Sequence, residues 1–321
     1  MLHNNTINFF LKLVLFLFGA LLIFMLCFGY LLPRLVKNSG DTKIERWNDF
    51  YSKPINAHAV ILGSSRAHRG INPQILTDSI GFEFHNMAFQ GMSLSNYSRF
   101  LNDYLLNNNP PQYVIISLDI LALAFRDRLA GDYYLIPGID NRSELLNQIY
   151  QFRYIKYCRA YGYFYYKNEF FSIIEYPNLA SYSGYEPIDK TWTTEHIKQN
   201  EQQNGEEYFP EDKRYISKID RIQSESYFRA LSDVVQKNNI EKLFLVLTPY
   251  YSESWETVSN QTELLLFVDS MAEKYDFKTI NFLYSDISKN SNYYYDPIHL
   301  NKNGSEVFSR AIADSLHLLI E

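Results

Sequence analysis

The sequence predicts an α/β domain, in which a parallel β-sheet is covered by helices on both faces, with one apolar helix placed before it. Three observations lead to this prediction. Short, almost wholly apolar segments alternate with amphipathic helical segments between residues 57 and 319. The first apolar segment ends abruptly in Gly63-Ser64-Ser65, and Pro110-Pro111 closes the helical segment before the next one. A separate run of twenty residues without a charge lies near the N-terminus.

The charge-free run extends from Leu13 to Leu32 and has no polar face. As a helix it matches the roughly 30 Å thickness of the hydrocarbon core of a bilayer. It is long for a cleaved signal peptide, and Tyr30–Pro33 is a poor cleavage context. We therefore expect a membrane anchor in residues 1–34, in contact with lipid through residues 13–32, and a polar stalk in residues 35–55.

The flanking charges do not decide the orientation of this anchor. Only Lys12 and the terminal amine precede the run, whereas Arg34, Lys37, Lys43 and Arg46 follow it. The positive-inside rule would keep the C-terminal side in the cytoplasm, but long domains translocate regardless of nearby charge. Both topologies stay open on this ground.

The remaining elements are expected in residues 56–321 in an alternating order. A helix capped by Ser93 or Ser95 should end before Pro110. The expected strands are 57–62, 82–87, 113–118, 243–247 and 279–282, and the later helices are 227–236, 262–275 and about 305–319. Strands of this composition are typical of a parallel sheet buried on both faces, hence of a doubly wound domain.

Residues 129–215 interrupt the alternation as a tyrosine-rich insertion. Ten of the 27 tyrosines lie between Tyr150 and Tyr185. Tyr150, Tyr154, Tyr157 and Tyr161 are spaced as one face of a helix. This face either packs against the core or forms aromatic walls for a sugar or an acyl chain.

The composition excludes several classes of protein. The 321 residues include 30 Lys+Arg and 36 Asp+Glu, and this slightly acidic balance argues against a nucleic-acid partner. With 46% hydrophobic residues the chain has enough apolar material for a core. Two cysteines, Cys27 and Cys158, provide no disulfide framework. Asp296 and His299 lack a third metal ligand, so we expect neither a metal nor another cofactor.

Three segments carry residues suited to nucleophilic catalysis. The first expected strand ends in Gly63-Ser64-Ser65, which places Ser65 at the carboxyl edge of the sheet, where ligands bind in such folds. A serine needs a base, which His299 can supply, and Asp296 can orient the imidazole. Gly91, in a turn after the second strand, can present its N–H to a substrate carbonyl.

Simpler interpretations exist for each of these residues. Ser65 can be only a helix cap, and His299 can be an ordinary loop histidine. His68 is a rival base three residues after Ser65, although a solvated role is expected for it. Arg66 can bind a carboxylate or an anionic polymer, although arginines are usually solvated.

Together these segments resemble the SGNH (GDSL-type) hydrolase superfamily, which has a flavodoxin-like three-layer α/β/α fold. The resemblance is to its membrane-anchored branch, such as DltD-like and alginate acetylation proteins. It implies that Ser65 is the nucleophile and that Asp296 and His299, in Asp296-Pro297-Ile298-His299, complete the triad. Asn86 and Gly91 match the second family block, so the expected oxyanion and substrate-binding groups are Gly91, the Ser65 backbone, Asn86 and Arg66.

The third family block, Gly-x-Asn-Asp, is missing. Asp119-Ile120-Leu121-Ala122 follows the third expected strand, so no Asn can donate to an oxyanion there. Asp119 is expected to cap the next segment. Losing one such donor costs about 3 kcal/mol. Catalysis is then slower, or Arg66 or a residue of the insertion replaces the donor.

The resemblance implies a membrane-anchored serine esterase or O-acyltransferase, with the domain outside the cytoplasm. The expected partner is an acylated carbohydrate polymer of the cell envelope, or another acyl ester. The alternative is a catalytically inactive scaffold that binds glycan or a membrane acyltransferase. The intact Ser65, Asp296 and His299 favour the enzyme, and the missing Asn favours the scaffold.

Overall fold

The computed structural model describes residues 2–27, 50, 54–124, 185–189, 191 and 219–320. The chain divides into two units. One includes the N-terminal helix α1, and the other, formed by Pro54–Asp132 and Tyr182–Glu321, contains the sheet. The proposed tyrosine helix at residues 150–161 and nearly all of the insertion lie outside the described residues.

Helix α1 (Leu2–Leu26) is long and apolar enough to cross a membrane. Its apolar part, Ile7–Leu26, has a mean hydropathy of 2.7, and its side chains are not buried in the structure. A secretion signal has the same properties, so the helix is a candidate for either. The apolar part begins six residues before the expected Leu13, and residues 28–32 of the expected span lie outside the described part of the chain.

The sheet has five parallel strands in the order β2-β1-β3-β4-β5. The strands are β1 (Ala59–Gly63), β2 (Phe84–Asn86), β3 (Tyr113–Leu118), β4 (Lys242–Leu247) and β5 (Lys278–Asn281). The register pairs Ala59 with both Phe84 and Tyr113, and Tyr113 with Lys242. This is the flavodoxin-like strand order: the chain adds β2 on one side of β1 and then β3, β4 and β5 on the other side. In such sheets ligands bind at the carboxyl ends of the strands, at the point where the order switches sides. The predicted fold class is confirmed.

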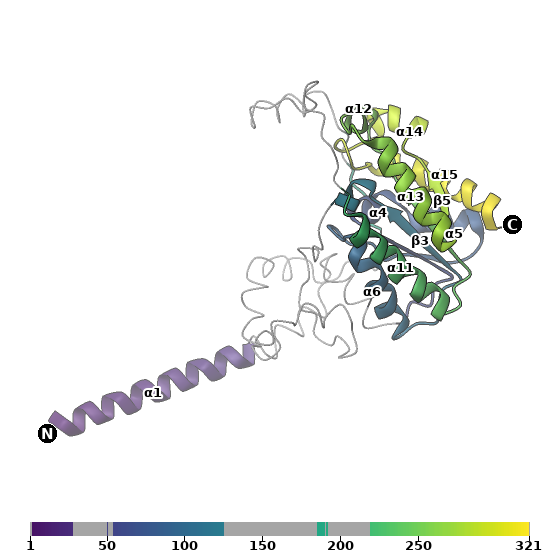
Figure 1. Ribbon diagram of the computed structural model, residues 1–321. Helices are drawn as coiled ribbons and strands as arrows, with labels where there is room; N and C mark the ends of the chain where they lie inside the picture. The colour runs from purple at the N-terminus through teal and green to yellow at the C-terminus, as the bar shows by residue number, and fades with distance from the viewer. Residues whose placement is uncertain are drawn as a thin grey trace, which may run out of the picture. The chain divides into compact units, whose positions relative to one another are not determined.

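Helices lie on both faces of this sheet (Figure 1). α15 packs against α4 and α5, while α11 packs against α6 and α13. The main helices are α4 (Ser65–Gly70), α5 (Pro73–Ile80), α6 (Leu94–Leu105), α11 (Arg221–Lys237), α13 (Gln261–Tyr275) and α15 (Lys302–Ile320). Shorter turns are η2 (Ile120–Ala124), α12 (Ser252–Glu256), α14 (Asp286–Lys289) and η3 (Ser291–Tyr293).

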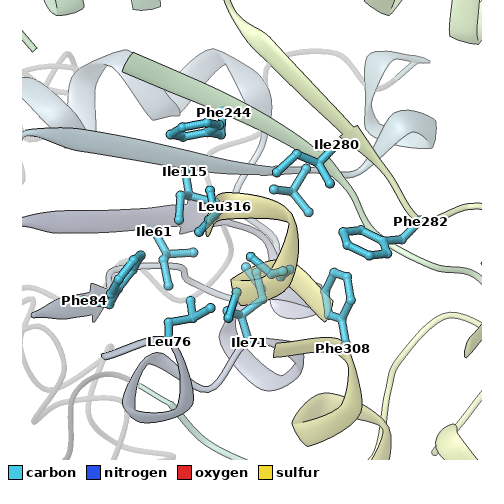
Figure 2. Packing of buried hydrophobic residues seen from close by; sticks show 14 of the residues in the cluster. Ile61, Ile71, Leu76, Phe84, Ile115, Phe244, Ile280, Phe282, Phe308 and Leu316 are labelled. Atoms are coloured by element: carbon cyan, nitrogen blue, oxygen red, sulfur yellow. The ribbon is translucent and has the colours of Figure 1, made fainter. Parts of the chain in front are cut away.

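The hydrophobic core under α15 explains why strands could be recognised in the sequence as apolar runs. In β1, β3 and β4 alternate residues face this helix, and the intervening ones are also buried, as in a sheet covered on both sides. Figure 2 shows Ile61, Ile71, Leu76, Phe84, Ile115, Phe244, Ile280, Phe282, Phe308 and Leu316 in this cluster. The packing fixes α4 and α15 against the same face, which places the start of α4 close to the loop that precedes α15.

Helix α5 was not predicted, although its sequence has both helix boundary signals. The Asn72 side chain accepts a hydrogen bond from the Gln74 N–H (3.0 Å), and Pro73 follows at the first helical position. The helix ends at Gly81, which has a φ of 91°. The segment is short and its apolar face is small, so periodicity alone missed it.

Candidate active site

Ser65 lies at the carboxyl end of β1, where it is the first residue of α4. The turn is tight because Gly63 has no side chain: a Cβ there would lie 2.5 Å from the Ala67 Cβ and 2.9 Å from the Ser117 Cβ. Ser64 caps α4 by accepting a hydrogen bond from the Arg66 N–H (3.4 Å). The strand therefore passes directly into the helix, and the Ser65 hydroxyl is left at the edge of the sheet.

His299 lies in the loop between η3 and α15. Asn301 organises this loop, because its amide donates to the carbonyls of Asn292 (2.8 Å) and Tyr294 (3.2 Å) and its oxygen accepts from the Gly304 N–H (3.0 Å). The His299 carbonyl accepts from the Tyr295 N–H (2.9 Å). Hydrogen bonds among its own residues thus hold part of the loop.

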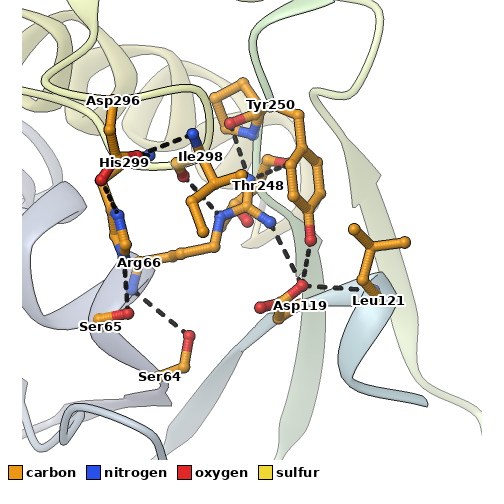
Figure 3. Close-up of polar contacts among 11 residues, drawn as sticks. Ser64, Ser65, Arg66, Asp119, Leu121, Thr248, Tyr250, Asp296, Ile298 and His299 are labelled. Carbon is orange, nitrogen blue, oxygen red and sulfur yellow. Dashed lines mark hydrogen bonds and ion pairs between the residues drawn. The ribbon is translucent and has the colours of Figure 1, made fainter. Parts of the chain in front are cut away.

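The structure brings Ser65, His299 and Asp296 together in one hydrogen-bonded chain (Figure 3). The Ser65 Oγ lies 2.8 Å from the His299 Nε2, and the His299 Nδ1 lies 2.7 Å from the Asp296 Oδ2. Both distances are within the range for a nucleophile, a base and an orienting carboxylate. When the proton is on Nδ1, Nε2 is free to accept the hydroxyl proton.

The Asp296 carboxylate is held so that it stays ionised. Its burial favours the neutral form, but hydrogen bonding and attraction from His299 outweigh this, helped by the N–H groups of Ile298 (2.9 Å) and His299 (2.8 Å). The pKa of Asp296 is therefore below its usual value. An ionised Asp296 favours the Nδ1-protonated imidazole and can stabilise an imidazolium.

Gly91 lies in the loop that follows β2. The Phe89 N–H donates to the Gly63 carbonyl (3.2 Å), so this loop reaches the end of β1, next to Ser65. Gly91 has a φ of 71°, a conformation that favours glycine. The N–H of Ser65 is at the first helical position, where no intrahelical acceptor exists. These two main-chain groups are the candidate donors for an oxyanion.

The Asn86 side chain is used within the fold. It is fully buried, its amide donates to the carbonyls of Ala67 and Ile71 (both 2.9 Å), and its oxygen accepts from the Ala88 N–H (3.0 Å). In this position Asn86 ties α4 to the loop that carries Gly91. It supports the site instead of facing a substrate, which differs from the expectation.

Arg66 also differs from the expectation of a solvated or substrate-binding arginine. Its side chain is buried and points away from the triad toward the ends of β3 and β4 (Figure 3). The guanidinium lies 3.5 Å from Asp119, which also accepts from the Leu121 N–H (3.3 Å). Asp119 thus caps η2 as expected and in addition pairs with Arg66.

His68 was expected to be solvated, but it is buried. Its Nε2 lies 3.2 Å from a carboxylate oxygen of Glu186, whose N–H donates to the His68 carbonyl (3.3 Å). The imidazole is occupied by this contact, while the Ser65 hydroxyl is paired with His299. His299 is therefore the better candidate for the base.

Sequence reasoning missed the parts played by Asn301 and by the Thr248–Tyr250 segment after β4, whose carbonyls face Arg66. The only available signal was the position of Thr248–Tyr250 directly after a buried strand. In the described part of the chain, no group of three His, Cys, Asp or Glu side chains is placed to hold a metal ion.

No protein-family model and no curated protein sequence matches this chain. Solved structures with a similar fold include a psychrotrophic esterase from Pseudoalteromonas sp. (13% identity, 82% of this chain and 97% of that one, TM-score 0.41). A lipase/acylhydrolase from Enterococcus faecalis is also similar (12% identity, 80% of this chain and 94% of that one, TM-score 0.38). An acetylxylan esterase from Geobacillus stearothermophilus is a third similar structure (11% identity, 82% of this chain and 94% of that one, TM-score 0.37). The chemical interpretation depends on the side-chain geometry.

Proposed function

We propose that this chain is an SGNH-type serine esterase or O-acyltransferase. The observation that carries the proposal is the hydrogen-bonded chain from Ser65 through His299 to Asp296, at 2.8 and 2.7 Å. Its three residues come from two segments more than two hundred positions apart, and they meet at the carboxyl edge of a parallel sheet. A helix cap alone would not need a histidine and a carboxylate aligned on its hydroxyl.

In the proposed reaction, the Ser65 Oγ attacks the carbonyl carbon of an acyl ester, and its proton moves to the His299 Nε2. The tetrahedral adduct then breaks its bond to the alcohol oxygen, which takes the proton from His299. This leaves an acyl ester on Ser65. Water or a sugar hydroxyl next gives its proton to His299 and attacks the acyl carbon, and Ser65 recovers its proton as the product leaves. Asp296 stays ionised throughout.

The negative charge of the adduct would be stabilised by the N–H groups of Ser65 and Gly91. The segment that stands where the family has its third block begins with Asp119 and holds no Asn, and the charge of Asp119 is balanced by Arg66. A site with two main-chain donors should work, but with a slower acylation step than one with three donors, because each donor is worth about 3 kcal/mol.

The substrate proposed is an acyl ester on a carbohydrate polymer of the cell envelope, with α1 as a membrane anchor and the α/β unit outside the cytoplasm. This part is supported by the motif resemblance and by the apolar length of Ile7–Leu26. A reporter that is active only outside the cytoplasm, fused after residue 321, tests the orientation. A silent but well-expressed fusion would contradict it.

A fluorophosphonate probe tests the catalytic proposal on the full chain in detergent. The wild-type protein should become labelled, and Ser65→Ala should not. Ser64→Ala is the matched control, since its hydroxyl caps α4 and is not bonded to His299. Labelling of Ser64→Ala but not Ser65→Ala supports the nucleophile; equal labelling of both variants rejects it.

Absence of labelling in a folded wild-type chain would favour the scaffold alternative, which Asp119 at the third-block position supports.

If labelling occurs, acetyl and longer acyl esters, supplied with and without an oligosaccharide acceptor, distinguish an esterase from a transferase. Release of free acid alone indicates an esterase, and a mass increase of the oligosaccharide by one acyl group indicates a transferase.

A further inference from the structure

Arg66 follows the nucleophile directly but extends away from it. In Figure 3 its side chain runs between the Asp296–His299 loop and the ends of β3 and β4. Only 4% of the residue is exposed. A buried charge is costly unless it is paired and hydrogen-bonded, so its contacts explain why an arginine is tolerated here.

The guanidinium joins three separate segments. Its Nε donates to the Ile298 carbonyl (3.1 Å), and its Nη2 donates to the carbonyls of Thr248 (3.0 Å) and Pro249 (2.8 Å). Its Nη1 lies 3.5 Å from the Asp119 carboxylate. The Tyr250 ring lies under the guanidinium, 3.5 Å from its carbon, and the Tyr250 hydroxyl donates to Asp119.

The bond to Ile298 has a direct consequence for the triad. Ile298 precedes His299, and its own N–H donates to the Asp296 Oδ1. Arg66 in turn follows Ser65. One rigid side chain therefore connects the residue after the nucleophile to the residue before the base. Because the Nε and Nη2 hydrogens point at main-chain carbonyls, the side chain is not available as a replacement oxyanion donor.

We propose that Arg66 is a positioning residue that sets the separation between Ser65 and His299 by holding the Ile298 main chain. This inference rests on the proposed serine esterase or acyltransferase function. The positioning role depends on the planar shape of the guanidinium. A lysine has the same charge, but it lacks the planar set of donors that reaches the carbonyls of Ile298, Thr248 and Pro249 together.

The test must separate positioning from stability, because Arg66→Met alone leaves the Asp119 carboxylate without its cation. The double variant Arg66→Met/Asp119→Asn removes both charges together, which should restore most of the lost stability. Arg66→Lys keeps the charge. Arg310→Lys on α15 is the matched control, since its guanidinium is exposed and pairs with Glu306.

Each full-length variant is assayed in detergent, well below its melting temperature, for probe labelling rate and for kcat and KM on a small acyl ester. We expect kcat to fall at least tenfold in Arg66→Lys and further in the double variant, with KM within about twofold and with Arg310→Lys unchanged. The melting temperature of the double variant should exceed that of Arg66→Met while its kcat stays low.

Recovery of full kcat together with the melting temperature in the double variant would overturn the positioning role and leave Arg66 a stabilising residue only. Unchanged kcat in Arg66→Lys would overturn it as well. Failure of the folded wild-type chain to label or hydrolyse is a different outcome, since it removes the proposed function and this inference with it.

Discussion

Ser65 and His299 meet at 2.8 Å, but the two sides of this contact are built differently. On the serine side, regular secondary structure fixes the position: β1 ends, Gly63 allows close packing, and α4 begins at once. On the histidine side, an irregular loop is fixed by side chains, chiefly the amide of Asn301 and the guanidinium of Arg66.

The difference shows how one site depends on two kinds of stabilisation. The serine side is stabilised by the sheet and by the hydrophobic core under α15. The histidine side depends on buried polar groups, each of which is costly when its partner is removed. Substitutions on the serine side should therefore act through packing, and those on the histidine side through individual hydrogen bonds and charge.

The largest expected effect comes from Asp296→Asn. The amide oxygen can still accept from the N–H groups of Ile298 and His299, so the loop should keep its shape. The amide NH₂ now faces Nδ1 and favours the wrong tautomer, for which a loss of about 10⁴-fold in kcat is expected. Ester hydrolysis kinetics measure this loss.

Asp286→Asn is the matched control for that variant, since Asp286 is exposed and pairs with Lys289 three residues on. It should leave kcat unchanged. A loss of less than tenfold in Asp296→Asn would show that the carboxylate does not orient the base.

Gly63→Ala tests the packing on the serine side. The added Cβ would lie 2.5 Å from the Ala67 Cβ, so α4 must shift away from β1. Overpacking of this kind costs about 1–3 kcal/mol in the free energy of unfolding. The shift moves Ser65 as well, so the labelling rate should also fall. Denaturant unfolding and the fluorophosphonate probe measure the two effects.

Gly70→Ala, at the other end of α4, is the control for Gly63→Ala. A Cβ at Gly70 would lie 3.7 Å from the Leu300 Cδ1, an ordinary van der Waals contact, so little change is expected. Equal labelling rates in the two variants would mean that the tight turn at Gly63 does not place the nucleophile.

The same contrast explains what the sequence could predict. β3 was predicted with its observed bounds, because all six of its residues are buried and its apolar run ends where the strand ends. β2 was predicted longer than its three residues, because Phe82 and Met87 continue the apolar pattern beyond the paired segment. Hydrophobic pattern thus identifies an element better than it identifies the ends of that element.

The parts of the site were predictable to different degrees for a physical reason. Residue types and spacing indicated Ser65, Asp296 and His299, whose catalytic role stays a prediction. The position of Arg66 was not predictable, because most of its hydrogen-bond partners are main-chain carbonyls, which every residue has. Asn86 matched a family motif, but only the fold shows that its amide is directed to Ala67 and Ile71.

Asn301→Ala tests the side-chain network of the histidine loop. The substitution leaves the buried carbonyl of Tyr294 and the N–H of Gly304 without this partner, at a cost of about 1–3 kcal/mol. We expect a lower free energy of unfolding and a smaller, roughly tenfold loss in kcat. Asn238→Ala removes one hydrogen bond, from the Asn238 side-chain amide to the Val234 carbonyl at the end of α11, and should change kcat little.

The smallest effect is the contribution of Asp296, on the histidine side, to the dependence of stability on pH. The pKa of Asp296 is lower in the folded chain than the unfolded value of about 3.9, so its carboxylate stabilises the fold above that pH and loses this contribution as the pH falls through the folded pKa. The difference in melting temperature between the wild-type chain and Asp296→Asn should accordingly narrow below about pH 4. The corresponding difference for Ser64→Ala involves no titrating group and should stay constant over the same range. If the difference in melting temperature from the wild-type chain narrowed equally for both variants, acid would be acting on the whole fold. The charge of Asp296 would then not be the cause of the narrowing.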